Sequence, residues 1–273
     1  MIVYPPCKIN LGLHVIRKRP DHFHDLETVF VAVALHDILE VLPSTDGKLH
    51  FSQSGIKVAG DPMKNLCVKA WQLLKHDHPA LPEVQIHLHK KIPAGAGLGG
   101  GSADAAYTLR ALDQLFGLGL GQEALLNYAA ELGSDCPFFI MDRPCYATGR
   151  GEILETTSVD LKGYRLMIVN PGIHIETARA FQSIKPAPSG KDLKAIIAQP
   201  LEQWKDQLQN DFEAPVFLDH PEIKKIKDEL YAAGALYASM SGSGSSVFAV
   251  FPKQVNISLQ WPEKYFIWTG PAQ

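Results

Sequence analysis

Two stretches of the chain alternate between apolar and polar residues, which is the two-residue period of a strand with one buried face. In residues 8–15 the polar positions include Lys8 and Asn10, so we expect these side chains to share the exposed face of a strand. Residues 84–89 follow the same pattern. Other β-rich stretches predict strands at 28–35, 38–42, 165–170, 235–240 and 247–251.

Elsewhere apolar residues recur at steps of three and four, the period of an amphipathic helix. This pattern predicts helices over residues 65–75 and 103–116, and a third helix that ends at Gly133. A fourth begins near Pro221 and ends at Gly234, because proline suits the first turn of a helix and glycine its end. We predict no strand between the helix at 103–116 and the one that ends at Gly133.

The order of these elements predicts an α+β protein. Its 273 residues fit either one large domain or two modest ones. A new set of strands and helices begins after about residue 155, so we expect two domains, residues 1–157 and 158–273.

Composition and charge exclude several classes of function. A formal net charge of −3 offers no broad positive field, so we do not expect a nucleic acid as partner. The four cysteines include no C-x-x-C pair, which favours reduced thiols. We see no signal peptide and no apolar run long enough to cross a bilayer, and therefore expect a cytoplasmic protein that does not bind a membrane.

A glycine-rich loop at residues 93–102 lies between the strand at 84–89 and the helix at 103–116. Glycine lets backbone N–H groups approach an anion closely, because no Cβ stands in the way and positive φ is accessible. The following helix adds unpaired amides and the positive end of its dipole. We therefore predict that the loop binds nucleotide phosphates. The residues assigned to this site are Pro93, Gly95, Gly97, Leu98, Gly99, Gly100, Gly101 and Ser102.

Other interpretations of this loop are open. From Gly95 it matches the G-x-G-x-x-G dinucleotide fingerprint, but that motif belongs to a strand-helix-strand unit that we do not predict here. It also resembles a P-loop, except that Gly101 stands where the lysine belongs. A flexible turn without a ligand is a third interpretation. Without any ligand, Ser102 would suit the N-cap of a helix and Asp104 its first turn.

Three motifs, at residues 5–11, 93–102 and 241–248, occur in the order typical of the GHMP kinase superfamily, which the chain resembles over nearly its whole length. Local motifs at 8–11, 97–102, 132–137 and 149–153 make it most similar to the members that phosphorylate 4-diphosphocytidyl-2-C-methyl-D-erythritol. One motif departs from the family pattern. The D-G-Y-H sequence is D-H-F-H here, so His22 and Phe23 replace a glycine and a tyrosine. Aromatic stacking is kept, and a contact from the tyrosine hydroxyl is lost.

The resemblance implies a two-domain GHMP kinase fold, with an amino-terminal domain like the second domain of ribosomal protein S5 and a ferredoxin-like carboxyl-terminal domain. It implies transfer of a phosphoryl group from ATP, which brings Mg²⁺ with it, to the 2-hydroxyl of that substrate, a precursor in the non-mevalonate isoprenoid pathway. ATP and substrate would lie in the cleft between the domains. The protein would be a monomer or a weak homodimer.

The same resemblance assigns the catalytic roles. Asp135 is carried over as the general base, and Lys8 as the cation that neutralises the phosphoryl oxygens. Ser102 is the candidate protein contact of Mg²⁺. Plainer interpretations exist for each residue: Asp135 suits a helix cap, and Lys8 suits the solvated face of a strand.

For the substrate, the resemblance implies contacts from Asn10, Phe23, His24 and Phe181. The two phenylalanines would hold the cytosine ring between them, while His24 reads its polar edge. Asn65 corresponds to a position near the adenine. Alternatively, Asn10 bonds a neighbouring loop, Phe181 is a core aromatic and Asn65 is an N-cap.

Two further possibilities remain from the sequence. His87 and His89 form an H-x-H pair that would suit a metal, but no third ligand is evident nearby. The competing functions are a mevalonate, homoserine or similar kinase, and a catalytically silent nucleotide-binding module that keeps the fold.

Overall fold

The computed structural model describes residues 1–58 and 60–272, and its contacts divide the chain into two compact units. Unit 1 comprises Met1–Cys7, Leu35–Ala94 and Gly99–Asp142. Unit 2 comprises Lys8–Ala34, Gly95–Leu98 and the residues from Arg143 onward.

This division differs from a single cut at residue 157. Strands β2 (Pro6–Lys18) and β3 (His24–His36) form one sheet with β7 (Cys145–Thr148) and β8 (Ile153–Thr156), in the order β2-β3-β7-β8. Strand pairing therefore groups part of the amino-terminal half with later residues. The boundary at residue 157 itself stays a prediction.

Unit 1 is built on a four-stranded sheet with the order β1-β4-β6-β5. Strands β1 (Ile2–Val3), β4 (Ile38–Pro43) and β6 (Val84–Lys90) pair antiparallel, and β5 (His50–Gly55) runs parallel to β6. The predicted alternation along β6 is confirmed, because every second side chain from its first residue is buried.

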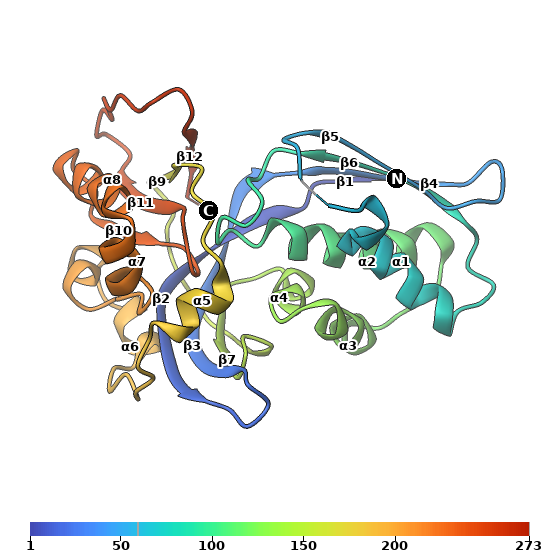
Figure 1. The fold of residues 1–273 in the computed structure, drawn as a ribbon, viewed down its shortest axis with the longest axis horizontal. Helices are drawn as coiled ribbons and strands as arrows, with labels where there is room; N and C mark the ends of the chain where they lie inside the picture. The colour runs from blue at the N-terminus through green and yellow to red at the C-terminus, as the bar shows by residue number, and fades with distance from the viewer. Residues whose placement is uncertain (59, 273) are drawn as a thin grey trace. The chain divides into compact units, whose positions relative to one another are not determined.

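The helices of unit 1 follow one another along the chain. Helix α2 (Gly100–Phe116) packs on β1 and β4, and α1 (Leu66–Asp77) packs beside it (Figure 1). Helices α3 (Gln122–Leu132) and α4 (Cys136–Met141) pack against each other and against α2. No strand separates α2 from α3 within the described residues 100–132, as predicted. This order excludes the strand-helix-strand unit of a dinucleotide-binding fold.

Unit 2 contains a second sheet, with the order β10-β11-β9-β12 and antiparallel pairing throughout. Its strands are β9 (Tyr164–Asn170), β10 (Tyr237–Met240), β11 (Val247–Pro252) and β12 (Phe266–Pro271). The helices of this unit are α5 (Thr177–Gln182), α6 (Leu193–Ile197), α7 (Glu213–Asp219) and α8 (Pro221–Ala232). The buried face of α8 joins one core with side chains of β9, β10 and β11.

The amino-terminal strand is longer and more deeply buried than its pattern predicts. Strand β2 is buried on both faces from Pro6 to Val15. Lys8 is 3% exposed and Asn10 is 1% exposed, so the expectation that they lie on an exposed face is wrong. A buried lysine and amide need polar partners, which the site described below provides.

Several elements are absent from the sequence-based prediction because they are short. Helices α4, α5, α6 and α7 have five to seven residues each, too few for a helical period to stand out. Two 3₁₀ segments, Pro62–Lys64 and Leu201–Asp206, are also new. The predicted start of the fourth helix at Pro221 is confirmed.

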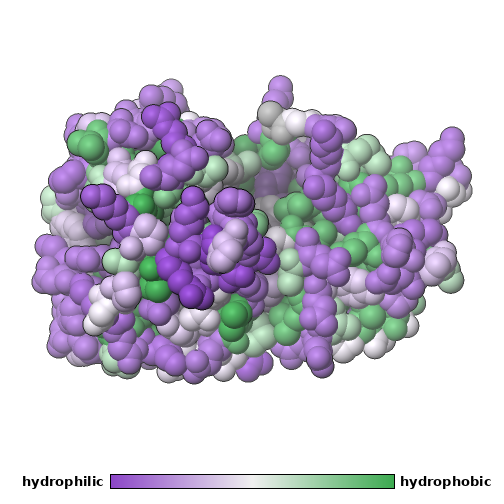
Figure 2. Space-filling view, turned by 60° about the horizontal axis from the view of Figure 1, so that its bottom comes forward, coloured by the Kyte–Doolittle hydropathy of each residue, from purple (hydrophilic) through white to green (hydrophobic). Residues whose placement is uncertain are grey.

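The surface is mixed in character. The face shown in Figure 2 carries mainly hydrophilic residues, with smaller apolar areas between them. Among the described residues, none of the helices combines the length and hydropathy that a bilayer crossing requires.

Packing of α8 predicts that two leucines of unit 2 contribute very differently to the stability of the fold. Leu230 is fully buried in the core, whereas Leu218 of α7 is 81% exposed. We expect Leu230→Ala to lower the free energy of unfolding by about 2–5 kcal/mol and Leu218→Ala to change it by less than about 0.5 kcal/mol. Urea unfolding of both variants checks this, and equal losses would contradict the assignment of the core.

Candidate active site

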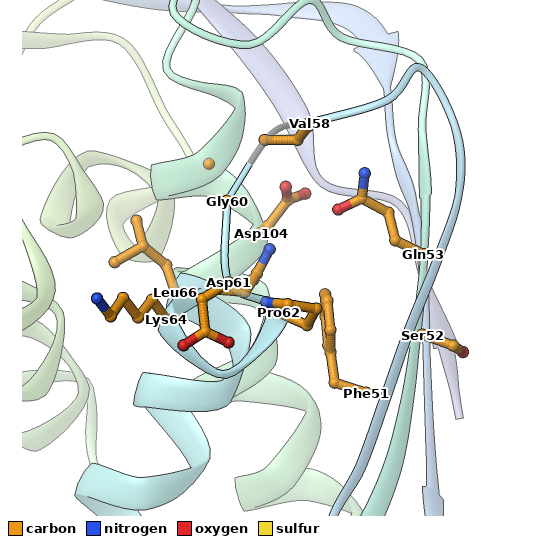
Figure 3. A pocket seen from close by; sticks show the side chains of 12 residues that line it. Phe51, Ser52, Gln53, Val58, Gly60, Asp61, Pro62, Lys64, Leu66 and Asp104 are labelled. Carbon is orange, nitrogen blue, oxygen red and sulfur yellow. The ribbon is translucent and has the colours of Figure 1, made fainter.

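Unit 1 contains a cavity of about 430 Å³ beside the start of α2. Its wall includes residues of β5, the segment before α1, and Gly101 and Asp104 of α2 (Figure 3). Asn65 also lines it, so two residues that the sequence assigned to nucleotide binding, Asn65 and Gly101, border one space. Asn65 is at the same time the N-cap of α1, since its side chain accepts a hydrogen bond of 2.9 Å from the Cys67 amide.

The start of α2 has the features expected of an anion site. Its cap residue is Gly99, which adopts φ 68° and has no side chain to accept from the amides of the first turn. These N–H groups point out of the helix end together with the positive end of the dipole. Ser102 lies within this first turn, so the interpretation of Ser102 as an N-cap is wrong.

A contact between α2 and α4 links this turn to the candidate base. The Ser102 hydroxyl lies beside the Cys136 thiol and lowers its pKa, but burial outweighs this effect and raises that pKa to about 12. Cys136 directly follows Asp135, and Asp135 is only partly buried. The helix start that suits a phosphate and the aspartate that the family resemblance assigns as base therefore belong to the same part of unit 1.

Asp135 occupies the N-cap position of α4, as the plainer interpretation expects. Its side chain nevertheless accepts no capping hydrogen bond from any described residue of the helix. A capping role therefore does not account for this carboxylate.

Three buried charged groups lie in the interior of unit 1. The Lys90 ammonium donates hydrogen bonds to Asp37 and, at 2.8 Å, to Asp104, and all three side chains are at most 4% exposed. Burial alone would lower the pKa of Lys90, but the two carboxylates outweigh it and raise that pKa. Burial, with the like charge of Asp37, raises the pKa of Asp104 to about 7, because one lysine cannot neutralise two buried carboxylates. The Oδ1 atom of Asp104 has no hydrogen-bond partner among the described residues.

In unit 2, Asn10 connects the first and third predicted motifs. Its Oδ1 atom accepts hydrogen bonds from the Lys8 ammonium at 2.7 Å and from the Gly242 amide at 2.9 Å. Its Nδ2 group donates to the Thr28 hydroxyl at 3.0 Å. Asn10 thus bonds a neighbouring loop, as its plainer interpretation expects, and it also orients the Lys8 ammonium.

The middle of the glycine-rich loop packs against the same third motif. A Cβ atom on Gly97 would lie 1.9 Å from the Ser241 carbonyl oxygen, and Gly97 adopts φ 76°. The Ser241 hydroxyl donates to the Gly97 carbonyl at 2.8 Å. Only glycine allows this approach, so packing between the two motifs is one reason for the glycine.

The residues assigned to the cytosine ring are arranged differently from a simple sandwich. The His24 ring stacks directly on Phe181, with ring centroids 4.7 Å apart and planes 9° apart. Phe181 also meets Phe212 edge-on at 4.9 Å and packs against the core of unit 2, which agrees with its interpretation as a core aromatic. Burial, and then the charge of Lys18, lower the pKa of His24, which favours a neutral imidazole at neutral pH.

Phe23 lies apart from that stack. It is 52% exposed, and the Arg150 guanidinium lies over its ring at 4.9 Å. Arg150 belongs to the G-R-G-E-I motif, so two sequence motifs meet here. The preceding residue, His22, adopts φ 66°, the left-handed conformation for which the family pattern has glycine.

Comparison with known proteins shows which family the chain belongs to. A model of the GHMP kinases N terminal domain matches residues 65–143, and a model of the GHMP kinases C terminal matches residues 192–266. A 4-diphosphocytidyl-2-C-methyl-D-erythritol kinase of Bacteroides fragilis is 49% identical over 260 residues, 94% of each chain. The chain belongs to the GHMP kinase family.

Other relatives of this GHMP kinase agree. A 4-diphosphocytidyl-2-C-methyl-D-erythritol kinase of Bacteroides thetaiotaomicron is 46% identical over 99% of both chains. A crystal structure of 4-(cytidine 5'-diphospho)-2C-methyl-D-erythritol kinase matches with a TM-score of 0.80 and 33% identity, covering 92% of this chain and 90% of that one. The mevalonate kinase of Methanococcus jannaschii, at 13% identity and a TM-score of 0.73 over 98% and 97% of the two chains, shares the fold. These likenesses confirm the predicted two-domain α+β fold.

Sequence reasoning on this GHMP kinase missed several residues that build the site. Thr28 accepts a hydrogen bond from Asn10. Asn210 holds the loop that Asn10 binds, because its side chain donates to the carbonyls of Met240 and Gly242 at 2.7 and 2.9 Å. Lys90 and Asp37 were missed as well. Lys90 continues the buried face of β6, where a lysine in an apolar register would have been a signal. No comparable local signal marks Thr28 or Asn210.

The described residues contain no group of three or more histidine, cysteine, aspartate or glutamate side chains arranged to hold a metal ion. His87 instead hydrogen-bonds Ser52 and Ser54, and His89 hydrogen-bonds Ser54. These contacts support the interpretation of both histidines as polar strand residues.

The backbone at His22 predicts a stabilising substitution. A left-handed conformation is unfavourable for a residue with a Cβ, so we expect His22→Gly to raise the free energy of unfolding by up to about 1 kcal/mol. The matched control is His76→Gly within α1, which should lower it by a few tenths to about 1 kcal/mol. Thermal or urea unfolding compares the two, and a loss of stability at both positions would contradict the strain at His22.

The raised pKa of Asp104 predicts a pH-dependent stability. The folded state keeps this proton to a higher pH than the unfolded chain, so its contribution is fully present below about pH 4 and is lost as the pH rises through about 7. Lys90, Asp37 and the Cys67 thiol are the titratable groups nearby. We expect wild type to lose stability relative to Asp104→Asn over this range. Urea unfolding at several pH values measures this, and a constant difference would contradict the shift.

Proposed function

We propose that this protein phosphorylates the 2-hydroxyl of 4-diphosphocytidyl-2-C-methyl-D-erythritol with ATP, in the non-mevalonate route to isoprenoid precursors. The observation that carries the proposal is the packing of α2 against α4, which brings the first turn of α2, with Ser102, to the helix that Asp135 begins. A phosphate-binding helix end and a carboxylate base are the two parts that phosphoryl transfer to an alcohol needs most. The near full-length identity to kinases of that name supports the choice of substrate.

In this proposal the nucleotide occupies unit 1. The adenosine lies in the cavity beside Asn65, and the phosphates lie along the glycine-rich loop and the amides at the start of α2. The absence of a side chain at Gly99 favours this, since nothing from the cap residue competes for the amides. The loop has no lysine of the P-loop kind, so in this proposal Lys8 provides the positive charge.

Asp135 accepts the proton of the attacking hydroxyl. Its carboxylate suits this role because it lies at the start of α4 and is only partly buried. Lys8 stabilises the negative charge on the transferred phosphoryl group, and Asn10 fixes the direction of its ammonium.

Mg²⁺ would accompany ATP and offset phosphate charge. The residues present fit this, because Mg²⁺ with a nucleotide usually takes only one or two protein ligands, and the Ser102 hydroxyl lies in the first turn of α2, where the phosphates are placed. We propose the Ser102 hydroxyl as the protein contact, which requires it to leave the Cys136 thiol.

The cytidine half of the substrate is assigned to unit 2. Aromatic surface for stacking on a pyrimidine comes from Phe23 and Phe181. The neutral imidazole of His24 suits the acceptor and donor atoms of the same ring. Binding of the ring between Phe23 and Phe181 requires His24 to leave the face of Phe181. We further propose that the protein acts in the cytoplasm, as a monomer or weak homodimer.

The role of Asp135 as base predicts a selective loss of activity when this residue, at the start of α4, is substituted. We expect Asp135→Asn to lower kcat by about 10²–10⁴-fold with the KM for ATP little changed, because the base acts in the chemical step. ADP release with Mg-ATP and the cytidyl substrate measures this, and phosphorus NMR identifies the product.

The matched control is Asp142→Asn at the other end of the same helix, where the side chain is 55% exposed. This variant should keep the activity of wild type. The proposal is contradicted if the two variants behave alike, or if wild type phosphorylates mevalonate or homoserine and not the cytidyl substrate.

A further inference from the structure

The three buried charges of unit 1 lie at both ends of the glycine-rich loop. We call Lys90, Asp37 and Asp104 the loop clamp. Lys90 is the last residue of β6, three residues before the loop begins at Pro93, and Asp104 lies in the first turns of α2 behind it. A single ammonium thus connects the strand that enters the loop with the helix that leaves it.

Asp37 holds the entry of the loop through the backbone. One of its oxygens binds the Lys90 ammonium, and the other accepts hydrogen bonds from the amides of Lys91 at 2.6 Å and Ile92 at 2.9 Å. The last two residues before Pro93 are therefore fixed by a carboxylate that is itself fully buried.

The exit of the loop packs on the same lysine. A Cβ atom on Gly100 would lie 2.8 Å from the Ile92 side chain and 3.3 Å from the Lys90 ammonium nitrogen. The first residue of α2 therefore lies directly on the clamp, and Asp104 ties the next turn to it by a charge-assisted bond of 2.8 Å.

Stability alone does not explain such a cluster. Burying an ion pair has a large desolvation cost, and replacement by apolar residues of similar volume is often neutral or stabilising. Here the clamp holds two carboxylates, which repel each other. The Oδ1 atom of Asp104 also has no hydrogen-bond partner among the described residues. The arrangement instead provides fixed directions, because charge-assisted hydrogen bonds hold two backbone segments at set positions.

We propose that Lys90 is a positioning residue for ATP: through Asp37 and Asp104 it fixes both ends of the phosphate loop, so that the amides of the loop are preorganised for the triphosphate. Lys90 does not touch the nucleotide in this role. The proposal rests on the proposed function, since it requires that the loop bind ATP. Preorganised donors bind an anion more tightly than donors that must first be ordered.

The test is the affinity of the purified full-length protein for ATP, measured by calorimetry with Lys90→Met. We expect the dissociation constant to rise about tenfold to a hundredfold, because small displacements of positioned groups have effects of this size. Lys69→Met, the same substitution at an exposed site of α1, should stay within about twofold of wild type.

Calorimetry separates positioning from a merely structural role. If Lys90 only supported folding, Lys90→Met would lower the fraction of competent protein, and so the stoichiometry, while the dissociation constant stayed that of wild type. That result overturns the clamp and leaves the proposed function intact. If wild type itself binds no ATP, the phosphate-loop assignment fails and the clamp fails with it.

A measurement on wild type keeps the proposal testable if Lys90→Met does not fold. In the absence of nucleotide, the amides of Lys91 and Ile92 should exchange hydrogen at least about a hundredfold more slowly than that of Gly47 in an exposed turn, because Asp37 holds them. Exchange as fast as at Gly47 would show that the loop entry is not fixed and would overturn the proposal.

Discussion

The amide groups at the start of α2 are the constraint on which the rest of unit 1 depends. A helix must satisfy its first N–H groups with a side chain, water or a ligand, and the cap residue Gly99 has no side chain. The cavity beside Asn65, the contact of Ser102 with Cys136 and the loop clamp all converge on this turn. An anion with a nucleoside attached is the ligand that such surroundings suit best.

Unit 2 has its own organising group in Asn10. One amide side chain binds the Lys8 ammonium, the Thr28 hydroxyl of β3 and the Gly242 amide, and thereby fixes a buried lysine between a strand and a loop. A buried ammonium without such partners would be costly, so the direction of Lys8 depends on Asn10. The strand face that the alternating pattern predicted to lie in solvent is thus a polar cluster inside the unit.

Local signals in the sequence revealed the longer elements and the glycine-rich loop. The alternation in β6, the helical period of α2 and the lack of a strand before α3 are all properties of neighbouring residues, and all three are confirmed. The resemblance to the GHMP kinases, carried by several short motifs, is confirmed by near full-length relatives.

The features that could not be predicted depend on contacts between distant segments. Burial of both faces of β2 arises from elements far along the chain, so its alternating pattern suggested an exposed face for Lys8. The pairing of Lys90 with Asp37 spans 53 positions, and no local period reveals it. The stack of His24 on Phe181 likewise joins two segments whose spacing carries no signal. Charge and hydrogen-bond partners of single buried residues are decided by the tertiary fold.

The most direct test of the phosphate site is an amide NMR titration of the whole protein with a non-hydrolysable ATP analogue and Mg²⁺. Gly100, Gly101 and Ser102 should show the largest shifts of their N–H resonances, because these groups would bind the phosphates. Saturation with the largest shifts at another helix, and no change at the start of α2, would contradict the assignment.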